Sequence, residues 1–276
     1  RKGINYRMSP ANIGVLKAAN IDVCVLANNH VLDWGRSGLV ETLDTLEEAG
    51  IASIGAGRNL AEATAPIVVP GAGNSRVILS AFGSTTSGIP ATWSAEDKVP
   101  GVKLLPAYCE AAISKVGASI RTLKGPSDIA VASIHWGGNW GYDIPKNERA
   151  VAHGLIDRAG VDIVHGHSSH HPKAIEVYHG KLILYGCGDF INDYEGIRGH
   201  GAFRSDLTLA YFARLATCDG TLLDLEMVPF RIRRLRLERA NHEDTRWLAE
   251  ALDRTSCPFG ARIEACPDDH LRVLWG

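Results

Sequence analysis

Four histidines fall within seven residues of this sequence, at His165, His167, His170 and His171. Neutral imidazole is the commonest side-chain ligand for zinc, iron, manganese and related ions in proteins. Neither packing nor solubility readily explains so many histidines in so short a stretch. The stretch therefore predicts a metal site.

Three other polar clusters follow short apolar runs. They are Asn28 to His30 with Asp33, His135 to Asn139, and Gly186 to Phe190. Ligands of open α/β sheets bind in the crevice beyond the carboxyl ends of the strands. We therefore expect the four clusters to meet at one edge of a sheet and to form one site.

Taken singly, these residues also have structural interpretations. Asn29 and His30 are suited to a turn, since asparagine favours such positions. Asp33 precedes a predicted helix and is suited to its N-cap. A lone histidine such as His135, after a run of apolar residues, is more often a hydrogen-bonded core residue than a ligand.

The chemistry that such a set can perform is metal-assisted hydrolysis. Two cations about 3.5–4 Å apart bind a phosphoryl group, activate a bridging water and stabilise the leaving oxygen. Sites of this kind combine imidazoles with carboxylates and often with an amide oxygen. The strand ends supply few carboxylates, so we expect sequence upstream of Arg1 to complete the set.

The elements that position these clusters alternate between strand and helix in the first two-thirds of the chain. Nearly continuous apolar runs predict buried strands at residues 21–27, 51–54, 77–82, 129–134, 161–164 and 182–185. Apolar positions at helical spacing predict helices at residues 35–49, 106–123 and 146–159.

The last third has a different pattern. Residues 206–215 and 221–229 flank Asp219-Gly220, a favoured turn dipeptide, and predict an antiparallel hairpin. The arginine-rich run 231–239 indicates a solvated strand or helix edge. Residues 242–252 predict a terminal helix. Residues 1–276 are thus expected to form a single α/β domain with a partly antiparallel second half.

Composition excludes several classes of function. The formal net charge is −2 and the sequence pI is near 6.6, which gives no general attraction to nucleic acid or to anionic lipid. No apolar run approaches the roughly 18 residues needed to span a bilayer. We therefore expect no nucleic-acid partner and no membrane segment in this chain.

The cysteines and the start of the chain bear on localisation. None of the six cysteines forms a CxxC pair, and Cys24 and Cys187 lie in apolar runs, which favours buried reduced thiols and the cytoplasm. The chain begins at Arg1 without an initiator methionine or a signal-peptide core. We therefore expect the natural N-terminus to lie upstream, and a membrane-anchored or extracellular protein is the alternative.

Several segments together resemble the CapA, or poly-γ-glutamate capsule synthesis (PGA_cap), family of the calcineurin-like metallophosphoesterases. The resemblance spans about two-thirds of the chain. It is carried by KGINYRMSP at residues 2–10, LANNHVLDWG at 26–35, GAGRNLAEA at 55–63, IHWGGNWGY at 134–142 and HGHSSHHPKAIEVYHGKLILYGCGDFIND at 165–193.

This resemblance implies roles for individual residues. The implied metal ligands are Asn29 (through its amide oxygen), His135, His167 and His170. The implied catalytic group is His30, as general acid or electrostatic stabiliser, with Asp33 and Asn139 supporting the ligands or facing the substrate. Asp189 stands where the family more often has asparagine.

The resemblance also implies a fold and a cofactor. The fold is a metallophosphoesterase-like four-layer α/β/β/α sandwich, N-terminally truncated because the family's first aspartate motifs would lie upstream of Lys2. The cofactor is a pair of divalent transition metal ions, either manganese, iron or zinc.

The implied function is a metal-dependent, phosphoesterase-like hydrolase of bacterial capsule synthesis. Its substrate is expected to be a phosphate-containing or polyglutamate-related compound. One alternative is a non-catalytic binding or assembly component, whose partners are subunits of a capsule synthesis and export complex. Another is a mononuclear zinc amidase, which predicts one metal ion per chain.

Overall fold

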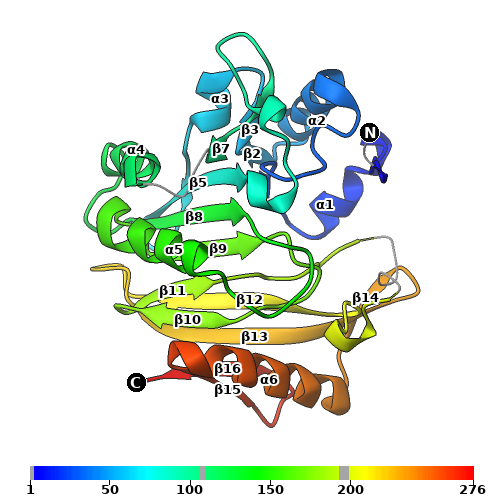
Figure 1. Cartoon of the computed structure of the whole chain (residues 1–276), viewed down its shortest axis with the longest axis vertical. Coiled ribbons are helices and arrows are strands. Elements are labelled where there is room, and N and C mark those ends of the chain that lie inside the picture. The colour runs from blue at the N-terminus through cyan, green and yellow to red at the C-terminus, as the bar shows by residue number, and fades with distance from the viewer. Residues whose placement is uncertain (1–2, 106–109, 193–198) are drawn as a thin grey trace.

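The computed structural model describes residues 3–105, 110–192 and 199–276. Its largest element is a seven-stranded sheet with the strand order β10-β11-β9-β8-β5-β4, in which β7 also pairs with β5 (Figure 1). The strands are β4 (Ile67–Pro70), β5 (Arg76–Ser84), β7 (Leu104–Leu105), β8 (Ile129–His135), β9 (Ile163–His167), β10 (Ile175–Tyr178) and β11 (Lys181–Leu184). Strands β5, β8, β9 and β11 run parallel, so their carboxyl ends lie at one edge.

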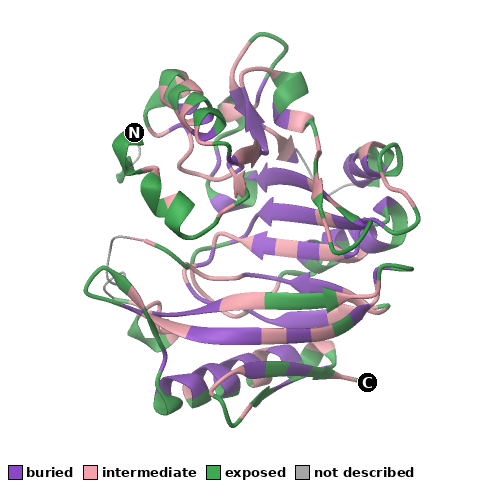
Figure 2. Cartoon of the chain, turned by 180° about the vertical axis from the view of Figure 1, so that it is seen from behind, coloured by how far each residue is buried: buried purple, intermediate pink, exposed green. Residues whose placement is uncertain are grey.

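Two helices pack against this sheet, α4 (Glu110–Arg121) and α5 (Lys146–Ala159). Helix α5 follows Pro145 and ends at Gly160, which adopts the left-handed conformation (φ 73°) typical of a helix C-terminus. Both helices bury their apolar faces on β5, β8 and β9. Strands β5 and β8 are buried along most of their length, whereas buried and partly buried residues alternate along β9 (Figure 2).

A five-stranded antiparallel sheet forms the second half. It contains β12 (Leu207–Leu215), β13 (Leu222–Arg233), β14 (Arg236–Arg239), β15 (Ala261–Ala265) and β16 (Leu271–Trp275). Helix α6 (His242–Ser256) begins after Asn241, whose side chain accepts a hydrogen bond from the Asp244 amide. Residues of α6 and of this sheet share a core with Ile175, Leu182 and Leu184 of the first sheet. The order helix, sheet, sheet, helix is the expected four-layer α/β/β/α arrangement.

The N-terminal part lies beyond β5 and has its own small core. It contains α1 (Gly14–Ala18), β1 (Val23–Val25), α2 (Gly35–Glu48), β2 (Ala52–Ile54), β3 (Ala56–Gly57), α3 (Leu60–Thr64) and β6 (Gly101–Val102). The Lys103 amide donates to the Gly55 carbonyl, and the Lys103 carbonyl accepts from the Gly83 amide. This residue therefore joins the small sheets to β5 of the large one.

Short 3₁₀ turns complete the structure. They are η1 (Pro10–Asn12), η2 (Thr85–Ser87), η3 (Ala91–Trp93), η4 (Gly201–Phe203) and η5 (Cys257–Phe259). Among the described residues, none of the helices is both long enough and apolar enough to cross a bilayer.

Most of the predicted elements are confirmed. Helix α2 and the predicted strands of the first two-thirds are present, although β1 is limited to three residues. Residues 106–109 of the predicted helix 106–123 lie outside the described residues, and α4 covers positions 110–121. The run 231–239 forms the end of β13 and β14, which confirms the strand alternative. The predicted helix at 242–252 is confirmed as α6, but it is not terminal, because β15 and β16 follow it.

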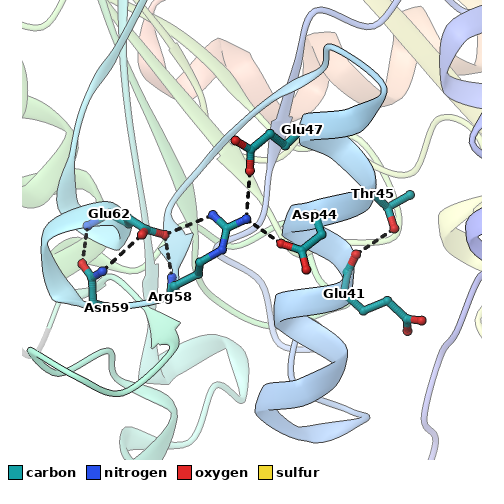
Figure 3. Close-up of polar contacts among 7 residues, drawn as sticks. All are labelled: Glu41, Asp44, Thr45, Glu47, Arg58, Asn59 and Glu62. Atoms are coloured by element: carbon teal, nitrogen blue, oxygen red, sulfur yellow. Dashed lines mark hydrogen bonds and ion pairs between the residues drawn. The ribbon is translucent and has the colours of Figure 1, made fainter.

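Two clusters of charged side chains connect elements of the fold, one buried around Asp162 and one at the surface around Arg58. The Asp162 carboxylate is buried and accepts from the Ala130 amide at 2.8 Å, from Lys124 Nζ at 2.5 Å and from Lys181 Nζ at 2.6 Å. By contrast, Arg58 is exposed and contacts carboxylates of α2 and α3 (Figure 3). Buried charges depend on their partners far more than exposed ones do.

We expect Asp162→Ala to lower the free energy of unfolding by about 2–4 kcal/mol, because it leaves a buried amide without its acceptor and two partly buried ammonium groups without their carboxylate partner. Arg58→Ala is the matched control and should cost less than about 1 kcal/mol. Urea denaturation of both variants measures the difference, and equal losses would contradict this account.

Burial lowers the pKa of Lys103 from 10.5 to about 8, although its Nζ donates to Ser80 Oγ at 2.9 Å. Between pH 8 and 10.5 the unfolded chain holds the proton more tightly than the folded one, so stability rises with pH across that window. Lys103→Met lacks this dependence. We expect the variant to gain about 1–2 kcal/mol over the wild type at pH 7 and to lose that advantage by pH 10.5. Urea denaturation at both pH values tests this, and a difference independent of pH would contradict it.

Candidate functional site

Three histidines, His135, His165 and His167, form a row at the site, which we refer to as the histidine row. The register between β8 and β9 sets their positions. Residue His135 pairs with His167, and Ser133 pairs with His165. Paired residues on neighbouring strands present their side chains to the same face. The Nδ1 atoms of His135 and His167 lie 3.0 Å apart, and Ser133 Oγ lies 2.9 Å from His165 Nδ1. Two predicted ligands separated by 32 positions in the chain are thus brought into direct contact.

Burial favours the neutral form of His165 and His167 near pH 7. It lowers the pKa of His165 to about 4. The pKa of His167 falls well below its ordinary value, first through burial and then through the adjacent His135 and His165. Neutral imidazole is the form that binds a metal ion. In addition, His167 Nε2 is buried and accepts or donates no hydrogen bond within the described part of the chain.

The His135 and His167 pair fits two ligands of one ion. With metal–nitrogen bonds of about 2.0–2.1 Å, two neighbouring ligand nitrogens lie roughly 2.9–3.4 Å apart in octahedral or tetrahedral geometry. The observed separation of 3.0 Å falls in this interval. However, no group of three or more His, Cys, Asp or Glu side chains within residues 3–105, 110–192 and 199–276 is arranged to hold an ion. The described residues therefore fit part of a metal site.

The predicted ligand His170 follows β9 and lies in a different environment. Its Nδ1 is 3.0 Å from Asp189 Oδ2, and its backbone amide donates to the Asn139 carbonyl. The ring of Trp140 lies 5.4 Å from that of His170. Asp189, whose role the sequence left open, thus pairs with a histidine, and the contact with Asn139 is made by the backbone.

The third group is His30 with Asp33. The Asp33 side chain is fully buried and lies 2.6 Å from His30 Nδ1, and it also accepts from the Tyr6 amide at 2.9 Å. Helix α2 begins after Trp34 without a side-chain cap, so the N-cap interpretation of Asp33 was wrong. A buried carboxylate on Nδ1 fixes the orientation and tautomer of the imidazole.

A cavity of about 300 Å³ lies beside His30. Its lining is mainly apolar and includes Leu26, Val31 and Trp34. This places the ring of His30 between the buried carboxylate of Asp33 and a hollow at the surface of α2.

One contributing segment was missed in the sequence, namely the polar residues 84–88 after β5. Ser87 Oγ donates to the His135 carbonyl at 3.0 Å, and the Gly137 amide donates to Thr86 Oγ1 at 3.1 Å. A Cβ atom at Gly88 would lie 3.8 Å from the side-chain nitrogen Nδ2 of Asn29. The segment therefore lies between the Asn29 loop and the β8 loop. Its signal was a run of serine and threonine at the end of a predicted strand.

Close backbone approach is a requirement at the site. A Cβ atom at Gly166, between His165 and His167, would lie 2.6 Å from Trp136 Nε1 and from the Tyr185 carbonyl oxygen. The Trp136 indole donates to that same carbonyl at 3.0 Å. Only glycine leaves room for this packing behind the histidine row.

The structure thus forms three groups from the predicted residues: His135 with His167, His170 with Asp189 and the Asn139 backbone, and His30 with Asp33. The Asn29 side chain faces the loop after β5. All these groups follow strands whose carboxyl ends lie at one side of the molecule (Figure 1). The roles implied for them as ligands or catalytic groups remain predictions.

Two facing sheets with outer helices define a metallophosphoesterase-like α/β fold. The chain is similar in fold to a crystal structure of a phosphatase from Mycoplasma pneumoniae, with a TM-score of 0.54 and 9% identity. The likeness covers 87% of this chain and 80% of that one. At this identity it concerns the fold alone.

The family is shown by sequence. The profile of the bacterial capsule synthesis protein PGA_cap matches residues 1–194. The chain is 47% identical over 276 residues to a probable polyglutamine synthesis accessory protein of Mycobacterium tuberculosis, covering 99% of this chain and 72% of that protein. It is 33% identical over 193 residues to the PGA biosynthesis protein CapA of Bacillus subtilis, covering 70% and 48%. The chain belongs to the PGA_cap family of capsule synthesis proteins, as its motifs indicated.

We expect Gly166→Ala to lower the free energy of unfolding by about 2–3 kcal/mol, since the added methyl group displaces Trp136 or the β11 backbone. Gly14→Ala is the control, because a Cβ there meets nothing within 4 Å. Thermal and urea unfolding measure both. An unchanged midpoint for Gly166→Ala would show that the strands can separate without cost.

Proposed function

We propose that this protein is a metal-dependent, phosphoesterase-like hydrolase that serves poly-γ-glutamate or capsule synthesis. The observation that carries this proposal is the pair of His135 and His167, whose Nδ1 atoms lie 3.0 Å apart at the carboxyl ends of β8 and β9, where burial lowers the pKa of His167 well below its ordinary value. The names of the relatives, which refer to polyglutamine synthesis, PGA biosynthesis and capsule biosynthesis, support the polymer pathway.

In this proposal the metal-holding residues are His135 and His167, joined by Asn29 and His170. A divalent ion bound there would polarise a phosphoryl oxygen and lower the pKa of a bound water. The chain's own contribution is to hold neutral imidazoles in place. The Asp189 carboxylate, 3.0 Å from His170 Nδ1, orients that ring.

His30 is proposed as the general acid. The Asp33 carboxylate holds the proton on Nδ1 at a distance of 2.6 Å, so Nε2 is the ring atom that exchanges a proton with the leaving oxygen. Its position beside an apolar cavity is suited to a leaving group with a hydrophobic portion.

The alternative is a binding or assembly component of a capsule synthesis complex. One observation favours it: among the described residues, no group of three or more His, Cys, Asp or Glu side chains is arranged to hold an ion. Under this alternative the site binds a ligand without hydrolysing it. The shared fold does not decide between the two functions, because function depends on the residues of the site.

Metal content separates the two accounts. After incubation with manganese, iron or zinc, we expect about two ions per chain by elemental analysis, falling to one or fewer in His167→Ala. His179→Ala is the matched control, because His179 is exposed and lies in the turn between β10 and β11, at the opposite end of the parallel strands from the candidate site. If wild type and His167→Ala hold equal amounts, or neither holds any, the hydrolase proposal is wrong and the binding alternative is favoured.

The role of His30 has its own test. His30→Ala should retain the metal but lower kcat for a phosphodiester such as bis-p-nitrophenyl phosphate by about 10²–10⁴-fold. Asp33→Asn should also lower kcat, because the His30 ring loses the carboxylate that orients it. Unaltered kcat in His30→Ala would remove this residue from the mechanism.

A further inference from the structure

An arginine-rich hairpin projects from the second sheet. It consists of residues 230–239, which form the end of β13 and all of β14, and we refer to it as the arginine hairpin. It carries five arginines and one glutamate, in a chain whose net charge is −2. The tip is exposed (Figure 2).

The pairing within this hairpin sets like charges against each other. Arg233 and Arg236 are directly opposite in the β13–β14 register, and Arg234 follows in the turn. Like charges in such positions repel. Arg231 is neutralised by Asp206 and Asp244. Within the part of the chain that the structure describes, Arg233, Arg234 and Arg236 have no carboxylate within 4 Å.

The turn itself is conformationally costly. Arg234 (φ 51°) and Leu235 (φ 61°) both adopt the left-handed region, as a two-residue type I′ turn requires. Asparagine and glycine are the usual residues there, because other side chains are strained in this conformation. Leu235 is 63% exposed, so packing does not offset the strain. Strain at an exposed charged tip is an indication of function.

The hairpin is connected to the candidate site through side-chain contacts. Phe230 at its base packs edge-to-face on Phe190, with ring centroids 5.7 Å apart, and the Arg239 guanidinium lies over the Phe230 ring at 5.6 Å. Phe190 directly follows Asp189, which pairs with His170. Figure 1 shows β14 on the same side of the molecule as the carboxyl ends of β8 and β9. An extended ligand on the hairpin would therefore lie near the site.

We infer that the arginine hairpin binds a linear polycarboxylate, the chemistry of a polyglutamate chain, and holds it beside the site. This inference rests on the proposed function for the identity of the polymer. Guanidinium groups pair with carboxylates through two parallel hydrogen bonds, and Arg233, Arg234 and Arg236 offer three of them at adjacent positions. A flexible polymer with a carboxylate on every residue can satisfy all three.

Other anionic partners fit less well. Single-stranded nucleic acid requires exposed aromatic rings on which bases stack. The aromatic residue of the hairpin, Phe230, is covered by Phe190 and Arg239. Insertion into a membrane surface requires a broad apolar face, whereas Leu235 is the one exposed apolar side chain of the hairpin.

The test is binding of fluorescein-labelled poly-γ-glutamate, followed by fluorescence anisotropy in 50 mM salt. The triple variant R233Q/R234Q/R236Q should bind at least about tenfold more weakly than the wild type, with a smaller salt dependence. The control R214Q/R246Q/R272Q removes three exposed arginines elsewhere and should bind like the wild type. Equal affinities of the two triple variants would overturn the proposal. Tighter binding of a single-stranded oligonucleotide or of phosphatidylserine vesicles than of the polymer would overturn the choice of partner.

Two further measurements keep the interpretation clear. Thermal unfolding of the triple variant is expected to match or exceed that of the wild type, because the repulsion is removed; if it fails to fold, the single variant Arg234→Glu takes its place. His167→Ala should retain polymer binding. A wild-type protein that binds the polymer but no metal ion would refute the hydrolase proposal alone, while a wild-type protein that binds metal but not the polymer would refute the hairpin proposal alone.

Discussion

The parallel register of β8 and β9 is the constraint on which the site depends. It sets His135 opposite His167 and Ser133 opposite His165, so that one face of two central strands ends in polar side chains. A shift of one residue would turn the histidines to the opposite face, toward α4 and α5. The apolar residues that alternate with them, such as Ile134 and Val164, are fully buried and oppose such a shift.

The same packing determines the chemistry of the histidines. Packing around the strand ends removes water from the rings, which is the main reason why the pKa values of His165 and His167 are depressed. Gly166 allows Trp136 and the β11 backbone to close behind the row. The fold thus keeps the imidazoles neutral but removes their hydrogen bonds to water. A metal ion or a hydrogen-bond partner that replaces the lost water would stabilise them.

The sequence predicted the central elements well, because buried parallel strands are nearly continuous apolar runs and their helices have clear stops. It could not predict which polar groups would meet. The pairing of His135 with His167 depends on register, and the choice of Asp33 between capping α2 and binding His30 depends on the path of Tyr6, 27 residues away. Strands β15 and β16 were missed because they are short and mix charged residues such as Arg262 and Arg272 with the apolar positions that face the core.

The carboxylates of the site have a consistent role. Asp33 and Asp189 each contact a histidine Nδ1, and neither lies with the His135 and His167 pair in a common cluster within the described residues. A carboxylate that accepts from an imidazole raises the basicity of the opposite ring nitrogen and fixes the direction of the ring. Because it is engaged in that contact, it does not bridge two ions. The few carboxylates at these strand ends therefore serve to orient imidazoles, which explains why a site rich in histidine can be poor in acidic ligands. If two ions bind here, their bridging group must come from a residue other than Asp33 and Asp189, or from solvent.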